Sequence, residues 1–218
     1  MPPAEGPRIA IVDYGMGNLA SVRNALLRLG ADALIAREPR LLEPAGAYVL
    51  PGVGAFPTAM DNLARFGLIE LLHTQVLEKR KPVLGICLGM QLFAERSSEL
   101  GSHGGLGWLP GSVERIEPGT AALRVPHVGW NQSRHSPDAS LFARVAPDTH
   151  FYFDHSYRVV CPDEFVVSRV DYGAPLVAAV AKGNVFGVQF HPERSQSAGL
   201  KVLRNFLNIA AEARPAAC

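Results

Sequence analysis

Cys87 stands in the pattern Gly-x-Cys-x-Gly, within the segment KPVLGICLGMQ at 81–91. An apolar run precedes the cysteine and a run with helical spacing follows it, so the pattern predicts a tight strand-to-helix turn. Such a turn would hold the thiol at the N-terminus of a helix, where the helix dipole favours the thiolate nucleophile. The backbone N–H of Leu88 would then face an oxyanion that develops on a substrate. Because short glycine patterns are common, the alternative that Cys87 is a buried core cysteine stays open.

His191 and Glu193 close an apolar run in VFGVQFHPERS, residues 185–195. A cysteine nucleophile needs a base, and the base needs a third group that orients it and stabilises its cation. A histidine followed two residues later by a carboxylate supplies both groups from one short segment. The distance along the chain to Cys87 is no objection, because such groups meet in space. Taken alone, the pair could also be a surface histidine beside a solvated carboxylate.

The segment LPGVGAF at 50–56 places two glycines after a predicted strand. Glycines let the backbone turn freely and approach a ligand closely. The N–H of Gly52 or Val53 could therefore supply a second donor to an oxyanion. Neither phosphate-binding glycine pattern is completed here, since no Gly-Lys-Ser/Thr follows and Pro57 stands where the third glycine would be. A simple turn is the remaining alternative.

These three segments must be positioned by the elements around them, and the first half of the chain alternates strands with helices. Apolar runs predict strands, and helical spacing with breaks at glycine predicts the helices between them. Strands are predicted at 8–13, 31–36, 47–50 and 81–86, and helices at 19–29, at 58–79 with a break at Gly67, and at 88–94. This order favours an α/β fold with a mostly parallel, flavodoxin-like central sheet flanked by helices.

The second half is predicted to add antiparallel strands to that sheet. Short strands separated by turns are expected between 100 and 135, longer ones at 150–160, 165–171, 176–183 and 185–190, and a closing helix at 198–212. The sequence shows no internal repeat and no long linker. We therefore expect a flexible N-terminal arm at 1–7, a single domain at 8–212 and a C-terminal tail at 213–218.

Composition excludes several classes of protein. The 218 residues are 48% hydrophobic and carry a formal net charge of +1, which gives no basic surplus for nucleic acid or a membrane surface. No apolar run is long enough to span a membrane, and the N-terminus does not resemble a secretory signal. Three cysteines without a CxxC pair (Cys87, Cys161 and Cys218) fit a reducing, cytoplasmic location. The other histidines, at 73, 103, 127, 135 and 150, lack ligand spacing, so we expect neither metal nor cofactor.

Taken together, PGVG, GICLGMQ and GVQFHPE resemble the class I, triad-type glutamine amidotransferases. The resemblance implies that Cys87 attacks the side-chain amide of L-glutamine, with His191 as acid and base and Glu193 as its orienter. Gln91, one turn after the cysteine, would help to bind glutamine. Glu99 stands where this branch often has a carboxylate that pairs with the amino group of glutamine.

Further segments narrow the resemblance to the glutaminase subunits of imidazole glycerol phosphate synthases. These segments are DYGMGNLASV, RVPHVGWN, FYFDHSYR and QFHPERSQ, and the resemblance covers roughly residues 8–210. It implies that ammonia passes to a (β/α)8 barrel synthase subunit, which makes imidazole glycerol phosphate and an aminoimidazole carboxamide nucleotide in histidine biosynthesis. His155, Ser156 and Tyr157 would lie beside the glutamine pocket, and PGVG would change its peptide orientation when the partner is loaded. Trp130 and Tyr152 would lie near the partner interface.

Two positions depart from that family, and two other functions stay open. Asp154 stands where an apolar residue is common, and Arg194 replaces a frequent interface lysine with a planar cation. We expect neither position to touch the proposed triad. The alternatives are the glutaminase of another amidotransferase, such as one for anthranilate or pyridoxal phosphate, and a binding module that has lost activity.

Overall fold

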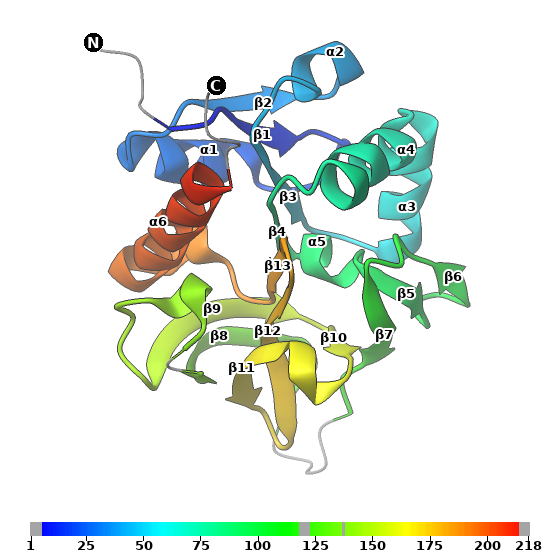
Figure 1. Cartoon of the computed structure of the whole chain (residues 1–218). Helices are drawn as coiled ribbons and strands as arrows, with labels where there is room; N and C mark the ends of the chain where they lie inside the picture. The colour runs from blue at the N-terminus through cyan, green and yellow to red at the C-terminus, as the bar shows by residue number, and fades with distance from the viewer. Residues whose placement is uncertain (1–5, 118–122, 137, 214–218) are drawn as a thin grey trace.

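Nine strands form the central sheet of the computed structural model, which describes residues 6–117, 123–136 and 138–213. In spatial order they are β2 (Ala33–Ala36), β1 (Ile9–Val12), β3 (Ala47–Gly52), β4 (Val83–Cys87), β13 (Val185–Val188), β12 (Pro175–Lys182), β11 (Val166–Asp171), β8 (His127–His135) and β9 (Thr149–His155). The strands from β2 to β13 are parallel, and those from β12 to β9 are antiparallel additions (Figure 1). The predicted fold class is therefore confirmed, with the order 2-1-3-4 of flavodoxin-like sheets at one end.

Helices cover both faces of the parallel strands (Figure 1). The strand β1 shows how the core divides, since Ile9 and Ile11 pack on one side and Ala10 and Val12 on the other. The first side is covered by α1 (Leu19–Arg28) and α6 (Gln196–Glu212), and the second by α3 (Phe56–Arg65) and α4 (Leu68–His73). Short helical segments complete the chain: α2 (Pro39–Leu42), α5 (Leu88–Gln91), the π-helical η1 (Thr74–Glu78), and the 3-10 turns η2 (Ser140–Phe142), η3 (Asp163–Phe165) and η4 (Pro192–Arg194).

A second, four-stranded sheet lies beside the central one. Its spatial order is β10 (Tyr157–Val160), β7 (Leu109–Arg115), β5 (Ala94–Ser97) and β6 (His103–Gly104). The sequence predicted one strand over 150–160, which was wrong, because the chain leaves β9 at Ser156 and pairs with β7 in the other sheet. The helix predicted over 88–94 was too long, because it ends at Gln91 and Ala94 already pairs with Leu109.

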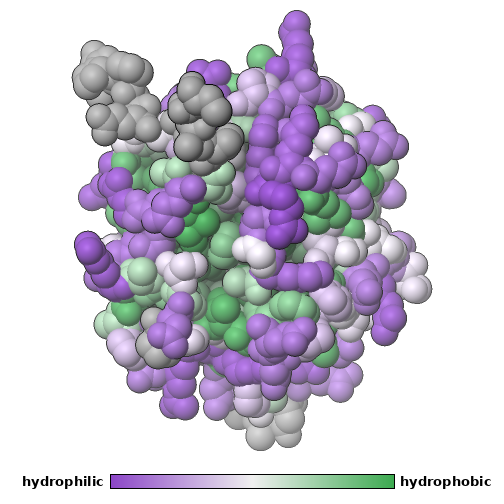
Figure 2. Space-filling view, in the orientation of Figure 1, coloured by the Kyte–Doolittle hydropathy of each residue, from purple (hydrophilic) through white to green (hydrophobic). Residues whose placement is uncertain are grey.

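Other predicted boundaries fit the structure more closely. The helical stretch at 58–79 is broken at Gly67, which adopts a left-handed φ of 65° and separates α3 from α4. Pro7 is buried against Gly46, while residues 1–5 of the predicted arm and 214–218 of the predicted tail lie outside the described residues. Helices long and apolar enough to cross a membrane do not occur in the described part of the chain. Figure 2 shows mostly hydrophilic residues on this face, with hydrophobic residues in separate patches between them.

The carboxyl ends of four neighbouring parallel strands gather the predicted functional segments at one edge of the sheet. DYGMGN follows β1, Gly52 ends β3, Cys87 ends β4, and His191 lies three residues after β13. Ligands of open α/β sheets bind at this edge, near the point where the strand order reverses. The topology thus brings together segments that are far apart in the sequence.

Candidate active site

Cys87 occupies a strained turn between β4 and α5. Its backbone has φ 55° and ψ −112°, a conformation that residues with a Cβ rarely adopt. The turn is possible because Gly89 lies directly on β3, where an added Cβ would come within 1.7 Å of the Leu50 carbonyl oxygen. The strand-to-helix turn expected from the glycine pattern is present. Because α5 has only four residues, its dipole is that of a single turn, and the groups around the sulfur matter more.

His191 and Glu193 form a buried pair next to this cysteine. The His191 Nδ1 atom lies 3.0 Å from Glu193 Oε1, and the two side chains are 5% and 1% exposed. Burial alone lowers the pKa of His191, but the hydrogen bonds and charges of Cys87 and Glu193 outweigh it and raise the pKa to about 10. The arrangement therefore favours an imidazolium that faces the cysteine sulfur, with a carboxylate behind it.

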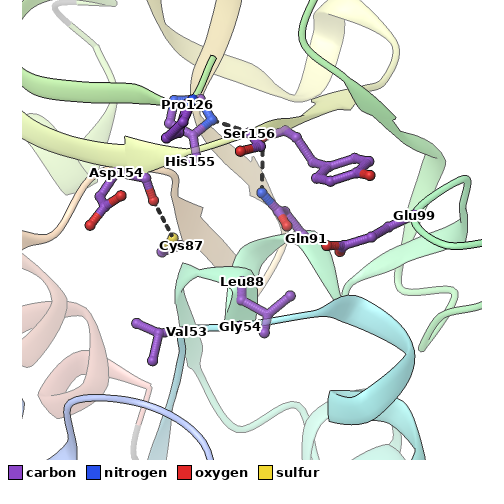
Figure 3. Close-up of a pocket in the computed structure, with 11 residues that line it drawn as sticks. Val53, Gly54, Cys87, Leu88, Gln91, Glu99, Pro126, Asp154, His155 and Ser156 are labelled. Carbon is purple, nitrogen blue, oxygen red and sulfur yellow. Dashed lines mark hydrogen bonds between the residues drawn. The ribbon is translucent and has the colours of Figure 1, made fainter.

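Two further groups contact the sulfur of Cys87, and one of them belongs to Asp154, so the expectation that Asp154 does not touch the triad was wrong. The carbonyl oxygen of Asp154 accepts the thiol hydrogen at 3.8 Å, and the Gln189 side-chain Nε2 donates to the sulfur at 3.6 Å (Figure 3 shows the first contact). Gln189 is fully buried, and it was not predicted from the sequence because it lies at the end of an apolar strand segment. The one signal in the sequence that could have placed Gln189 near the site was His191, two residues later.

A cavity of about 290 Å³ opens in front of Cys87. Seven of the residues predicted for the site line it together with the cysteine, namely Val53, Leu88, Gln91, Glu99, His155, Ser156 and Tyr157 (Figure 3). Gly52 lies behind this lining, against Leu88. Gly54, Pro126 and Asp154 also line the cavity, and their place there was not predicted from the sequence.

Gln91 and Glu99 present acceptor atoms to this cavity. The Nε2 of Gln91 donates to the Tyr157 carbonyl at 3.1 Å and to Gln189 Oε1 at 3.0 Å, which uses both of its hydrogens. The side-chain carbonyl of Gln91 therefore remains as an acceptor. One carboxylate oxygen of Glu99 accepts from the N–H of Phe56 at 2.9 Å, at the start of α3. A carboxylate and an amide oxygen together suit a ligand that carries an ammonium group.

A chain of neutral side chains supports the opposite wall. His155 Nδ1 donates to the Tyr157 carbonyl at 2.8 Å, His127 Nδ1 lies 3.0 Å from His155 Nε2, and Asn131 Nδ2 lies 3.2 Å from His127 Nε2. Burial lowers the pKa of both histidines to about 4, with a further lowering of His127 by the charge of His155 and of His155 by the charge of His191. The imidazole of His127 also stacks on Tyr172, with ring centroids 4.0 Å apart.

The loop after β1 packs under the glycine-rich end of β3. A Cβ added to Gly52 would lie 2.3 Å from the Tyr14 hydroxyl, and one added to Gly17 would lie 3.2 Å from the Pro51 carbonyl oxygen. The Tyr14 hydroxyl is buried without a hydrogen-bond partner, and burial together with the charge of Cys87 raises its pKa. DYGMGN had no predicted place in the site, and it forms the floor beneath the glycine-rich segment.

The residues predicted for a partner interface lie on one exposed face. Trp130 is 48% exposed and pairs across β8 and β9 with Tyr152, and their rings meet edge to face at 6.2 Å. The Arg194 guanidinium lies over the Tyr152 ring at 4.1 Å. Asp154 is exposed opposite Val128, two positions along the same strand pair, so it lies both on this face and at the cavity.

Histidine, cysteine and carboxylate side chains do not gather in threes that could hold a metal ion anywhere in the described ranges. The remaining histidines have other contacts, such as His135 with the Val145 carbonyl and His73 with the ring of Trp108. The site that the residues form is therefore a buried cysteine, histidine and carboxylate beside a polar cavity.

Comparison with known proteins is consistent with this geometry. The family described as glutamine amidotransferase class-I matches residues 10–210. Imidazole glycerol phosphate synthase subunit HisH 2 of Vibrio vulnificus is 48% identical over 92% of the chain and 94% of its own length. Subunit HisH of Methanothermobacter thermautotrophicus is 49% identical over 92% of the chain and 98% of its own length.

Solved structures share the fold at lower sequence identity. One of them, solved as a glutamine amidotransferase, superposes with a TM-score of 0.73 at 22% identity and covers 93% of this chain and 98% of its own. The structure of PurLQS from Thermotoga maritima gives a TM-score of 0.69 at 23% identity, with 94% of this chain and 99% of that chain covered.

Proposed function

We propose that this chain, which belongs to the class-I glutamine amidotransferase family, hydrolyses L-glutamine to glutamate and ammonia. The observation that carries the proposal is the strained Cys87 turn beside the buried His191–Glu193 pair, at the ends of the adjacent strands β4 and β13. A raised pKa on His191 favours an ion pair with the thiolate, which is the reactive form of a cysteine.

In the first half of the reaction, the Cys87 sulfur attacks the side-chain amide carbon of glutamine. The electron pair of the C=O bond moves to oxygen and forms a tetrahedral oxyanion. When this intermediate collapses, His191 gives its proton to the leaving nitrogen, the C–N bond breaks, and ammonia departs. The product is a γ-glutamyl thioester on Cys87, with His191 neutral and still oriented by Glu193.

In the second half, water attacks the thioester carbon. His191 takes a proton from that water, and the new oxyanion collapses with cleavage of the C–S bond. Glutamate leaves, and the cysteine thiolate and the histidine cation are restored. The γ-carboxylic acid of the product ionises in water, so the balance is one glutamine and one water consumed for one glutamate, one ammonia and one proton released.

Stabilisation of the two oxyanions is assigned to backbone donors. Leu88 follows the nucleophile and lines the cavity, so its N–H is the first donor. The second comes from Gly52 or Val53, at the end of the strand that pairs with β4 opposite Cys87. We propose that this glycine-rich segment completes the second donor when a loaded partner is bound.

Binding of the substrate is assigned to the polar lining of the cavity. The carboxylate of Glu99 and the side-chain carbonyl of Gln91 would accept hydrogen bonds from the α-ammonium group. The segment from His155 to Tyr157 forms the facing wall, where its backbone and the Ser156 hydroxyl would position the rest of glutamine. A cavity of about 290 Å³ matches a small amino acid better than a nucleotide.

The destination of the ammonia is assigned from the relatives. Because relatives at 48% and 49% identity are named as subunits of imidazole glycerol phosphate synthase, we propose that this chain is the glutaminase subunit of such a synthase. A (β/α)8 barrel partner would join the ammonia to phosphoribosyl-formimino aminoimidazole carboxamide ribonucleotide (PRFAR). It would release imidazole glycerol phosphate and an aminoimidazole carboxamide ribonucleotide (AICAR). Free ammonia is mostly protonated near neutral pH and is then not nucleophilic, which favours its transfer inside a complex.

The face that would receive this partner carries Trp130, Tyr152 and Arg194. Large aromatic and arginine side chains are typical anchors of protein interfaces. The same strand β9 contacts the triad segment, since the backbone N–H of His191 donates a hydrogen bond to the backbone carbonyl of Tyr152 at 2.9 Å. A partner that displaces β9 would therefore also displace the backbone of the catalytic histidine. The exposed Asp154 would favour a basic group on the partner.

Exchange of Cys87 for alanine tests the proposed function. In the complex with the barrel partner, Cys87→Ala should abolish glutamine-dependent synthesis and preserve synthesis from added ammonium salts, because only ammonia production needs the thiol. The measurement is imidazole glycerol phosphate formation from PRFAR with each nitrogen source. If the wild-type chain releases no glutamate from glutamine, with or without PRFAR and the barrel partner, the proposal is wrong.

The same assay separates the alternatives left by the sequence. A glutaminase of another synthase would be active only with the partner and acceptor of that enzyme. An inactive binding module would resist labelling of Cys87 by a glutamine-derived electrophile such as 6-diazo-5-oxonorleucine, even with the partner and nucleotide present. Labelling at Cys87 would favour the catalytic function over the binding one.

A further inference from the structure

We infer that Gln189 is a further catalytic residue of this chain, whose side-chain N–H donates a hydrogen bond to the Cys87 sulfur and stabilises its thiolate. The inference rests on the proposed function for its biological meaning, but its test does not depend on glutamine. The sequence pattern assigned no role to this residue, although it lies two residues before His191. Its evidence is the 3.6 Å contact between Gln189 Nε2 and Cys87 Sγ and the network that orients the amide.

The orientation of the Gln189 amide is fixed by its neighbours. The Tyr157 carbonyl can only accept, so the Gln91 group that contacts it at 3.1 Å must be the NH₂ group. The second hydrogen of that NH₂ group then points to Gln189 at 3.0 Å, which must present its oxygen there. The NH₂ group of Gln189 is left to face the sulfur of Cys87.

The Tyr157 carbonyl that begins this chain is itself held in place. His155 Nδ1 also donates to it, which leaves His155 Nε2 as an acceptor for His127 Nδ1. Asn131 then donates to the other nitrogen of His127. A single carbonyl thus sets the direction of every hydrogen bond from Asn131 to Gln91.

Burial makes the contact with sulfur chemically relevant. Gln189 is 0% exposed, so its amide hydrogens have no water to turn to. In the thiol form, the Cys87 hydrogen points to the Asp154 carbonyl. The thiolate form has lost that hydrogen, and the Asp154 carbonyl cannot donate one. The donors that face the negative sulfur are then His191 and Gln189. A hydrogen bond that is stronger to the charged form shifts the equilibrium toward that form.

A structural role for Gln189 would leave the sulfur's reactivity with a neutral electrophile unchanged at every pH. The test therefore measures the pH dependence of Cys87 alkylation by iodoacetamide in the full chain, followed by mass spectrometry of the peptide that contains Cys87. Peptide analysis is needed because Cys161 is also free. Thiolate reacts and thiol does not, so the midpoint of the rate profile reports the ionisation.

Two substitutions bracket the effect. Gln189→Met keeps the approximate side-chain volume and removes the donor, and Gln189→Glu keeps the oxygen that accepts from Gln91 but sets a second oxygen against the sulfur. We expect Gln189→Met to move the midpoint upward by about one pH unit and to slow alkylation at neutral pH about tenfold. Gln189→Glu should move it at least as far, because a carboxylate repels a thiolate.

Gln75→Met provides the matched control. Gln75 is also a buried glutamine, 2% exposed, but it lies in η1 away from the cavity. Its substitution should change stability and leave the alkylation profile at its wild-type midpoint. This control separates the loss of a buried amide from the loss of a donor to sulfur.

The outcomes separate this inference from the proposed function. Wild-type alkylation profiles in both folded Gln189 variants would overturn the role of Gln189, whatever happens to glutamine hydrolysis. A shifted profile in a chain that never hydrolyses glutamine would uphold it and reject the proposed function. If neither variant folds, the side-chain amide resonance of Gln189 in the wild-type chain should titrate with the alkylation midpoint, and a resonance that does not move would overturn the inference.

Discussion

The parallel and antiparallel halves of the central sheet both bring histidines to the site, and they hold them in opposite protonation states. At the end of the parallel strand β13, contacts with Cys87 and Glu193 raise the pKa of His191 to about 10 despite its burial. On the antiparallel strands β8 and β9, burial lowers the pKa of His127 and of His155 to about 4. All three imidazoles are buried, so burial alone does not set the outcome.

The partners of each imidazole explain the difference. His191 faces a sulfur and a carboxylate, and both are stabilised by a cation between them. His127 lies beside His155, and His155 is close to His191, so a proton on either one would meet a like charge in addition to the cost of burial. The Tyr157 carbonyl and Asp154 favour a proton on His155 but do not offset its burial. Groups pushed to opposite pKa values in one site are typical of a division between chemistry and positioning. We therefore expect the parallel half to carry the reacting groups, and the antiparallel half to form the cavity wall and the binding surface for the partner.

The largest test of this comparison exchanges one histidine from each half. His191→Asn should lower kcat for glutamine more than about a thousandfold, because the leaving nitrogen and the attacking water lose their proton carrier. His127→Asn should cost about tenfold and act mainly on KM, since it loosens the wall at Tyr157 without touching the reacting atoms. Both values come from steady-state glutamate release in the loaded complex.

Circular dichroism and thermal unfolding of both variants serve as controls for folding. Equal losses of kcat in His127→Asn and His191→Asn would break the division between the two halves. A variant at His127 that loses kcat without any change in KM would assign it to the chemistry rather than to the wall.

The second test uses the pH dependence of stability. His127 and His155 have folded-state pKa values below the unfolded value, so their contribution is complete above about pH 6.5 and is lost as the pH falls toward 4. We expect the contribution of these two histidines to the free energy of unfolding to fall by about 4 kcal/mol between neutral pH and about pH 5, and His127→Gln to remove about half of that fall. Urea unfolding at a series of pH values measures both.

His191 should act on the opposite limb of the same profile. Its folded-state pKa is raised, so its contribution is present below the unfolded value and is lost as the pH rises toward 10. The difference in stability between wild type and His191→Asn should therefore shrink on the alkaline side. A difference that instead shrinks only in acid would contradict the assigned protonation states.

The sequence predicted the parallel half more completely than the antiparallel half, for a physical reason. Around Cys87 the signals are local, since the buried strand, the glycines and the turn all lie within a few residues. The division of 149–160 between two sheets at Ser156 depends on pairing with β8 and β7, which no local pattern encodes. Gln189 was missed for the same reason, because the Gln91 that orients it is 98 residues away.

The smallest effect concerns the exposed face of the antiparallel half. Trp130→Ala should weaken binding of the barrel partner about tenfold, because a half-exposed tryptophan that meets Tyr152 is a typical interface anchor. Isothermal titration of the two proteins measures the affinity, and Leu77→Ala, at an exposed apolar residue in η1, is the matched control. Iodoacetamide alkylation of Cys87 in Trp130→Ala should stay at the wild-type rate, because the indole does not line the cavity. Unchanged affinity would show that the partner does not bind at Trp130 on β8 and β9. The antiparallel half would then contribute only the wall of the cavity.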